Sequence, residues 1–156
     1  MQKQFTGQDL RNAGIPILML NIPVSAQIHI PDTSCEEVFN TDPVQACVKE
    51  SWRTSPKNLK RAKLILATKK QDNAPTYTRE ILGVFEYTDA GQDKQPNNNG
   101  YRCSHFIGVR PAAEEWIEKF KDGVIVGLNP RATNPLRYFI DPAEHKSLSH
   151  KKSNKN

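Results

Sequence analysis

Two clusters of cationic and aromatic residues have the clearest chemical potential in this sequence. The first lies in residues 49–70, where eight Lys/Arg face one acid, and it contains Trp52-Arg53 and Lys60-Arg61. The second is "RATNPLRYFI", residues 131–140. Guanidinium groups bind phosphates and aromatic rings stack on bases, so both clusters predict contact with nucleic acid.

In the first cluster, Arg53 and Arg61 are expected on the surface, where they can bind phosphates. Trp52 has two possible roles. It can stack on a base beside Arg53, or it can pack in the core, as a tryptophan near the end of an amphipathic helix usually does.

In the second cluster, the Asn134 amide offers a donor and an acceptor, as needed to bind a base edge. Arg131 and Arg137 supply forked donors suited to phosphate or guanine, and Tyr138 can stack or pack. The alternative is structural. In that case Asn134-Pro135 only shapes a turn, and the arginine stems cover apolar surface.

Metal and cofactor chemistry has little support in the sequence. The three cysteines, Cys35, Cys47 and Cys103, show no CxxC spacing, and Cys103 and His105 have no second pair to complete a zinc site. No phosphate-binding glycine loop and no catalytic triad can be recognised. We therefore expect no cofactor, no metal and no catalytic residues.

Two other functions stay open. One is a nuclease or base-processing enzyme, with Glu86 and His105 as proton-transfer groups on neighbouring strands. The other is a protein-interaction module whose basic face binds an acidic partner.

The charge distribution favours a polyanion as partner. The net charge of +5 is uneven, because residues 1–50 carry three Lys/Arg and six Asp/Glu (net −3), which leaves +8 for residues 51–156. A basic half of this kind is typical of nucleic-acid-binding proteins, although it also occurs on ordinary soluble surfaces.

Length and hydropathy predict one domain that is not in a membrane. The 156 residues suit a single globular unit, 1–141, followed by a basic tail, 142–156, with too few apolar residues to pack. The apolar run "IPILMLNIPV" has about half of the ~20 residues that a membrane span needs. The odd cysteine count and the absence of a leader predict a cytoplasmic protein.

Sequence patterns predict alternating short helices and strands. Ser55 and Pro56 form a helix start, and Pro111 is expected to open a helix that ends at Gly123. The predicted helices span residues 34–40, 43–53, 56–62 and 111–123. The predicted strands span 15–23, 25–30, 63–68, 79–88, 101–109 and 136–140, with a flexible loop between residues 89 and 100.

The order of several short motifs between Val44 and Ile140 resembles a small module found C-terminal to some prokaryotic GIY-YIG nuclease domains. These motifs are "SWRTSPKNLKRAKLILAT", "ILGVFEYT", "YRCSHFIGVRPA" and "VGLNPRATNPLRYF". The pattern is also similar to PUA-like and ASCH-like domains, many of which bind RNA or modified DNA. The resemblance implies an α+β fold with a small curved or barrel-like mixed sheet and covering helices.

Together these observations predict a non-catalytic domain that binds DNA or RNA. Its predicted binding residues are Trp52, Arg53, Arg61, Arg131, Asn134, Arg137 and Tyr138.

Overall fold

The longest apolar runs form the centre of the sheet in the computed structural model, which describes residues 3–22, 39–49, 52–70, 78–128 and 136–140. Strand β2 (Ile17–Asn21) lies parallel to β3 (Leu64–Lys70), and Ile17 pairs with Leu64. Strand β3 is antiparallel to β4 (Arg79–Glu86). The central residues of these strands, ILML, LILA and ILGVF, are buried on both faces, which explains why these stretches are continuously apolar.

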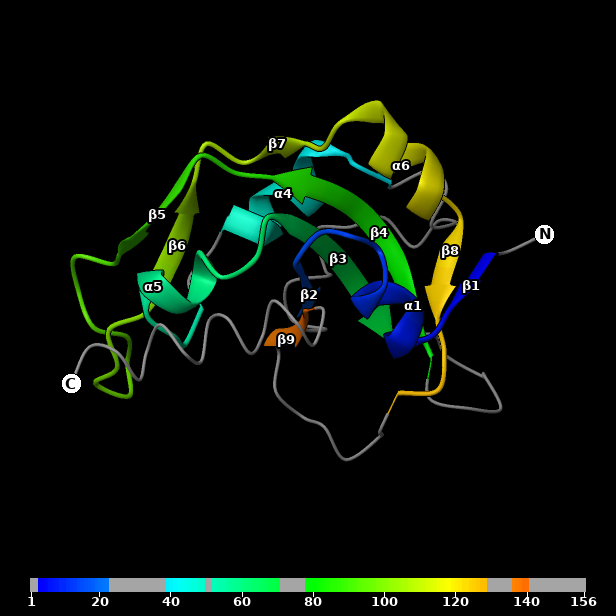
Figure 1. The fold of residues 1–156 in the computed structure, drawn as a ribbon. Helices are drawn as coiled ribbons and strands as arrows, with labels where there is room; N and C mark the ends of the chain where they lie inside the picture. Colours follow the sequence, from blue (N-terminus) through cyan, green and yellow to red (C-terminus); the bar gives the residue numbers. More distant parts are fainter. Residues whose placement is uncertain (1–2, 23–38, 50–51, 71–77, 129–135, 141–156) are drawn as a thin grey trace.

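The main sheet curls around this centre, and β4 forms its arch (Figure 1). Its strand order is β1 (Lys3–Phe5), β8 (Gly123–Ile125), β4, β3, β2 and β9 (Leu136–Phe139), with β7 (Arg110–Pro111) paired to the end of β4. Strands β5 (Asp89–Gln92) and β6 (Ser104–Ile107) form a separate antiparallel hairpin. The fold is therefore α+β with a small curved mixed sheet, as the sequence predicts.

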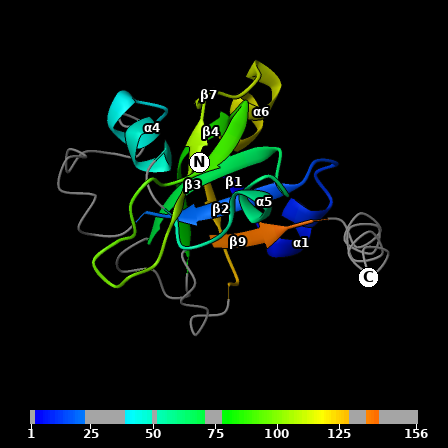
Figure 2. The same ribbon diagram turned by 90° about the vertical axis from the view of Figure 1, so that its left-hand side faces the viewer.

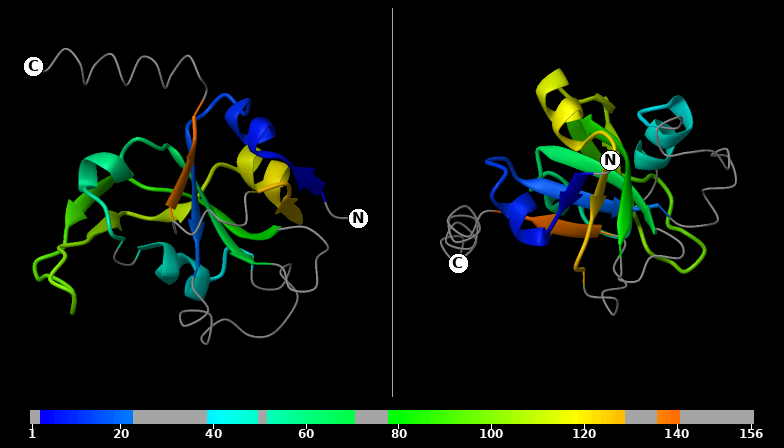
Figure 3. Two further views of the ribbon diagram at one scale, coloured as in Figure 1. Left: turned by 90° about the horizontal axis from the view of Figure 1, so that it is seen from below. Right: turned by 90° about the vertical axis from the view of Figure 1, so that its right-hand side faces the viewer.

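Two apolar clusters lie on opposite faces of the sheet. Helices α4 (Asp42–Lys49) and α5 (Pro56–Leu59) and the β5–β6 hairpin cover one face. Helices α1 (Gly7–Arg11) and α6 (Glu114–Phe120) cover the other. Seen from below, α1 and α6 lie near β1 and β8, and the hairpin projects at the far end (Figure 3).

A β-bulge in β4 changes which side chains of this strand pack in each of the two apolar clusters. The β3–β4 register shifts between Ala67 and Thr68. As a result Leu82 and Phe85 lie in the cluster under α4 and α5 rather than on opposite faces. A side chain at Gly83 would approach the Phe85 ring to 2.5 Å and Asn40 Oδ1 to 2.6 Å. Glycine is therefore required here by close packing and not by a bend.

The structure differs from the sequence prediction at several points between residues 43 and 123. Residues 89–92, expected in a flexible loop, form β5, because their backbone pairs with β6. Pro111 lies in β7, and α6 begins only at Glu114, because Phe85 and Glu86 of β4 provide a pairing edge for residues 110–111. The helix predicted over 43–53 is α4, which ends at Lys49, and Trp52 instead forms a β-bridge with Ser104.

Several predicted elements lie outside the described residues. These are the strand at 25–30, most of the helix at 34–40 and the tail at 142–156. In the described part of the chain, none of the helices has the length and apolar character needed to cross a membrane.

Candidate functional site

Helix α5 positions the first cationic cluster as the sequence predicts. The Ser55 hydroxyl accepts a hydrogen bond from the Asn58 N–H at 3.2 Å, and Pro56 occupies the first turn. Leu59 anchors the helix in the core with no exposed surface. Around this anchor lie the cationic residues that we call the α5 patch, which are Arg53, Lys57, Lys60 and Arg61.

Two tyrosines hold the end of α5 against the sheet. The Tyr138 hydroxyl of β9 donates to the Asn58 carbonyl at 2.6 Å. The Tyr87 hydroxyl donates to the carbonyls of Leu59, at 3.2 Å, and Ala62. The Asn58 carbonyl also accepts the Arg61 N–H at 3.2 Å, so the Tyr138 hydroxyl is a second partner there. The last carbonyls of a helix lack intrahelical partners, and the Tyr87 hydroxyl supplies one at Leu59, the last residue of α5. Figure 2 shows α5 beside β9, as the contact between Tyr138 and Asn58 requires.

Arg61 lies over one of these tyrosines. Its guanidinium carbon is 4.9 Å from the centre of the Tyr138 ring, within the range of a cation–π contact. Its Nε is buried without a hydrogen-bond partner, and the residue forms no ion pair with any described residue. Tyr138 therefore holds the Arg61 charge in place, and no acid in the described part of the chain neutralises it.

Arg53 forms a second pair of the same type. Its guanidinium carbon lies 4.1 Å from the centre of the Tyr101 ring, and Arg53 too lacks an ion pair with the described residues. Tyr101 is 52% exposed. Tyr101 is not among the binding residues predicted from the sequence, although an aromatic residue beside Arg102 at the end of an asparagine-rich loop is a signal that could identify it.

The other cations of the α5 patch are exposed. Lys60 forms an ion pair with Asp89 at 3.2 Å. The pKa of the Asp89 carboxyl lies below its usual value, because the Ala90 N–H and then Lys60 stabilise its charged form. From Trp52 to Lys70 the chain has seven Lys/Arg and no Asp/Glu, so the patch contributes net positive charge.

Trp52 is a core residue, which is one of the two roles that its sequence leaves open. It is only 6% exposed, and its indole N–H donates to the Val48 carbonyl at 2.9 Å. Its backbone exchanges two hydrogen bonds with Ser104. A base cannot stack on the indole in this position, so we do not retain Trp52 as a binding residue. Its contribution is to fix Arg53, the next residue, next to β6.

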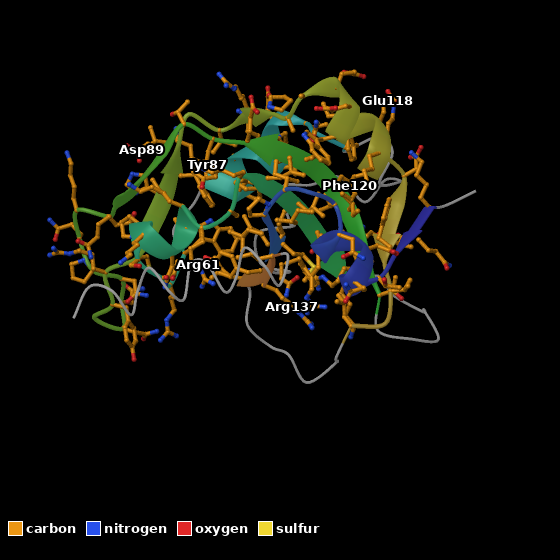
Figure 4. The ribbon with its side chains drawn as sticks, in the orientation of Figure 1. Arg61, Tyr87, Asp89, Glu118, Phe120 and Arg137 are labelled. Carbon is orange, nitrogen blue, oxygen red and sulfur yellow. The ribbon has the colours of Figure 1, made fainter. Side chains whose placement is uncertain are left out.

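Arg137 lies apart from the α5 patch. Leu136 and Tyr138 of β9 pack on the cluster under α4 and α5, whereas Phe139 packs on the opposite one. Since side chains alternate along a strand, Arg137 shares the face of Phe139, whose ring it approaches at 5.5 Å. Figure 4 shows Arg61 and Arg137 at separate places on the molecule. Arg131 and Asn134 lie outside the described residues.

The proposed proton-transfer pair is not assembled as predicted. Glu86 belongs to β4 and His105 to β6, but β6 forms a separate sheet with β5, so β4 and β6 are not paired. Glu86 instead accepts a hydrogen bond from Arg110 at 2.5 Å. His105 Nδ1 lies 2.6 Å from Asp93 Oδ1. Among the described residues, no three His, Cys, Asp or Glu side chains gather in a way that could hold a metal ion.

No protein-family model, curated protein or solved structure matches this chain. The resemblance to the module beside GIY-YIG nucleases, and to PUA-like and ASCH-like domains, therefore stays a prediction.

The two tyrosines that hold α5 give the protein an expected pH dependence. Burial raises the pKa of both Tyr87 and Tyr138 to about 12 from an ordinary 10.0, and the nearby Arg61 charge opposes this rise at Tyr138. The folded state thus favours the neutral hydroxyls. Their stabilising contribution is complete below pH 10 and is lost as the pH rises through 12.

After allowance for partial exposure, we expect the free energy of unfolding to fall by about 1–2 kcal/mol per tyrosine over this range. Urea unfolding at a series of alkaline pH values measures the loss, and tyrosinate absorbance follows the ionisation. The control is the double variant Tyr87→Phe/Tyr138→Phe, whose free energy of unfolding should not show this decrease at alkaline pH. An identical pH dependence in both proteins would contradict the assignment.

Proposed function

We propose that the protein binds nucleic acid, without catalysing a reaction on it, through the α5 patch. The observation that supports this proposal is that Arg53 and Arg61 each lie over a tyrosine ring and lack ion pairs with the described residues. A cation–π contact orients the guanidinium without neutralising it. The exposed Arg53 can therefore donate to phosphate oxygens, whereas Arg61, whose Nε is buried, contributes through its charge and its terminal N–H groups.

A polyanion suits this surface better than a small anionic ligand does. The α5 patch spreads four cations over residues 53–61, and three of them, Arg53, Lys57 and Lys60, are exposed. Asp89 of the neighbouring hairpin pairs with Lys60, so the four cations together with this acid carry a net charge of +3. Asp93 pairs with His105 and not with the patch. Spaced cations of this kind match successive phosphates along a strand.

The sequence adds support for the same class of ligand. The resemblance to PUA-like and ASCH-like domains favours RNA or modified DNA, and the cysteine usage favours action in the cytoplasm. Both inferences are part of the proposal.

The direct test is fluorescence anisotropy with labelled single-stranded and double-stranded DNA and RNA of one sequence, at two salt concentrations. We expect binding that weakens as salt rises. The control variant replaces the tail lysines Lys146, Lys151, Lys152 and Lys155 by Gln, and it should retain most of the affinity. The proposal is wrong if wild-type binding is no stronger than the tail alone provides. In that case competition with an acidic protein extract would test the protein-interaction function.

A base-processing or nucleolytic activity is the second candidate, favoured by one contact. Asp93 holds His105 Nδ1 at 2.6 Å, and a carboxylate in this position fixes the ring orientation of a histidine that acts as a general base. If the protein has this activity, it should cleave or modify the same oligonucleotides over multiple turnovers, and His105→Gln should abolish that conversion. If the protein binds the oligonucleotides but they are recovered uncleaved and unmodified, this enzymatic activity is excluded.

A further inference from the structure

Tyr101 is held by an ordered turn although its side chain is exposed. Asn97 Oδ1 accepts hydrogen bonds from the N–H groups of Asn99 and Tyr101, both at 2.9 Å. The Asn97 N–H donates to the Tyr101 carbonyl at 2.7 Å, and Gly100 adopts a φ of 82°, which glycine favours. The asparagine-rich stretch before Tyr101 is therefore a turn organised by the Asn97 amide.

This turn is also attached to the hairpin and to the segment that precedes α5. The Asn97 amide nitrogen lies 3.7 Å from Cys103 Sγ, to which it donates a hydrogen bond, and Cys103 is buried. The Ser104 hydroxyl donates to the Thr54 carbonyl at 2.6 Å, next to Arg53. Tyr101 and Arg53 are thus presented from two segments that β6 holds together, and their relative position is set before any ligand binds.

The Tyr101 ring has the exposure and surroundings of a stacking group. The Arg53 guanidinium lies 4.1 Å from the ring centre and covers one face of the ring, while the residue as a whole is 52% exposed. A base would therefore stack on the face that Arg53 leaves uncovered. Exposing a large aromatic side chain carries a hydration cost, and here the surrounding turn keeps it in place. The neighbouring charge is cationic and matches a ligand that combines flat rings with negative charge.

We propose that Tyr101 and Arg53 form a stacking site for an unpaired base, so that the ligand of the α5 patch is single-stranded nucleic acid. This inference rests on the proposed nucleic-acid-binding function and narrows it. An exposed ring can stack only on a base whose face is open, which excludes the interior of a duplex. The base stacks on the Tyr101 ring, and the cations of the α5 patch bind the phosphates on either side.

The test compares the affinities of wild type and Tyr101→Leu for a single-stranded DNA oligonucleotide, its duplex, and the same single strand with abasic sites. We expect Tyr101→Leu to weaken binding to the normal single strand about 5- to 100-fold, with the salt dependence unchanged because no charge is removed. Tyr101→Trp should retain the affinity. The abasic strand should bind wild type as weakly as the normal strand binds Tyr101→Leu.

The matched control is Ile107→Ala, since Ile107 is the other large apolar side chain found exposed on the described part of the hairpin, at 43%. It should leave binding unchanged. If wild type binds nucleic acid but Tyr101→Leu binds the single strand equally well, or if the duplex binds more tightly, the stacking site is wrong and the α5 patch stands. If wild type binds neither these probes nor the RNA probes of the first test beyond the contribution of its tail lysines, both proposals fail.

Discussion

Replacing Arg53 and Arg61 together by alanine is expected to weaken nucleic-acid binding by about tenfold to a hundredfold at low salt, because two charged hydrogen-bonding contacts are lost. The slope of log affinity against log salt should also decrease, by roughly 1.5 for two phosphate contacts. Anisotropy titrations over a series of salt concentrations measure both quantities in one experiment.

Two controls separate the α5 patch from the general charge of the protein. Lys119→Ala/Lys121→Ala removes the same charge at α6, at the opposite end of the sheet from α5 (Figure 1). It should change the affinity by less than about twofold. Arg53→Lys/Arg61→Lys keeps the charge but loses the planar fork, so it should retain the salt slope while affinity falls. Equal losses in the alanine variants of both regions would contradict a localised site.

Phe106→Ala is expected to lower the free energy of unfolding by about 3–5 kcal/mol, as is typical for a large aromatic residue removed from a packed core. Phe106 has no exposed surface, and its ring centre lies 4.7 Å from that of Tyr87. The β5–β6 hairpin is a two-stranded sheet, which is only marginally stable by itself. Its attachment therefore depends on this side chain.

Urea unfolding measures the decrease in the overall free energy of unfolding in Phe106→Ala. Hydrogen exchange shows which part of the structure is destabilised. The backbone amides of Thr88 and Asp93, which bind the carbonyls of Ile107 and Cys103, should exchange faster than amides of β3. Ile107→Ala, one residue further along the same strand, removes an exposed side chain and should change stability by less than about 0.5 kcal/mol. Similar effects of both substitutions would show that the hairpin is held by other contacts.

The β5–β6 hairpin and α5 are connected through Tyr87. Tyr87 contacts Phe106 with its ring and the end of α5 with its hydroxyl. A change in the packing around Phe106 should therefore shift the Tyr87 hydroxyl, which holds the end of α5 and so affects the position of the arginines next to it. The α5 patch and the β5–β6 hairpin consequently form one packed unit, on which the proposed binding site depends.

Local signals in the sequence determined the central part of the fold. The runs around Leu18 and Ile65 are apolar at consecutive positions, and such a pattern requires burial on both faces wherever the strand lies. The Ser55-Pro56 pair begins a helix through contacts within a single turn. The exposure of Arg53 followed from the same local information, whereas Arg61, which is also predicted on the surface, is half-buried against Tyr138.

Only the tertiary structure decided which distant segments meet. Pro111 has the features of a helix start, yet it lies in a strand, because residues 110–111 pair with the end of β4. The strand of His105 pairs with residues 89–92 and not with the strand of Glu86, since strand partners are selected by packing over the whole domain. For the same reason the pairing of Arg53 with Tyr101, 48 positions along the chain, could not be predicted from the sequence. Contacts of this kind depend on chain topology, which local residue patterns do not encode.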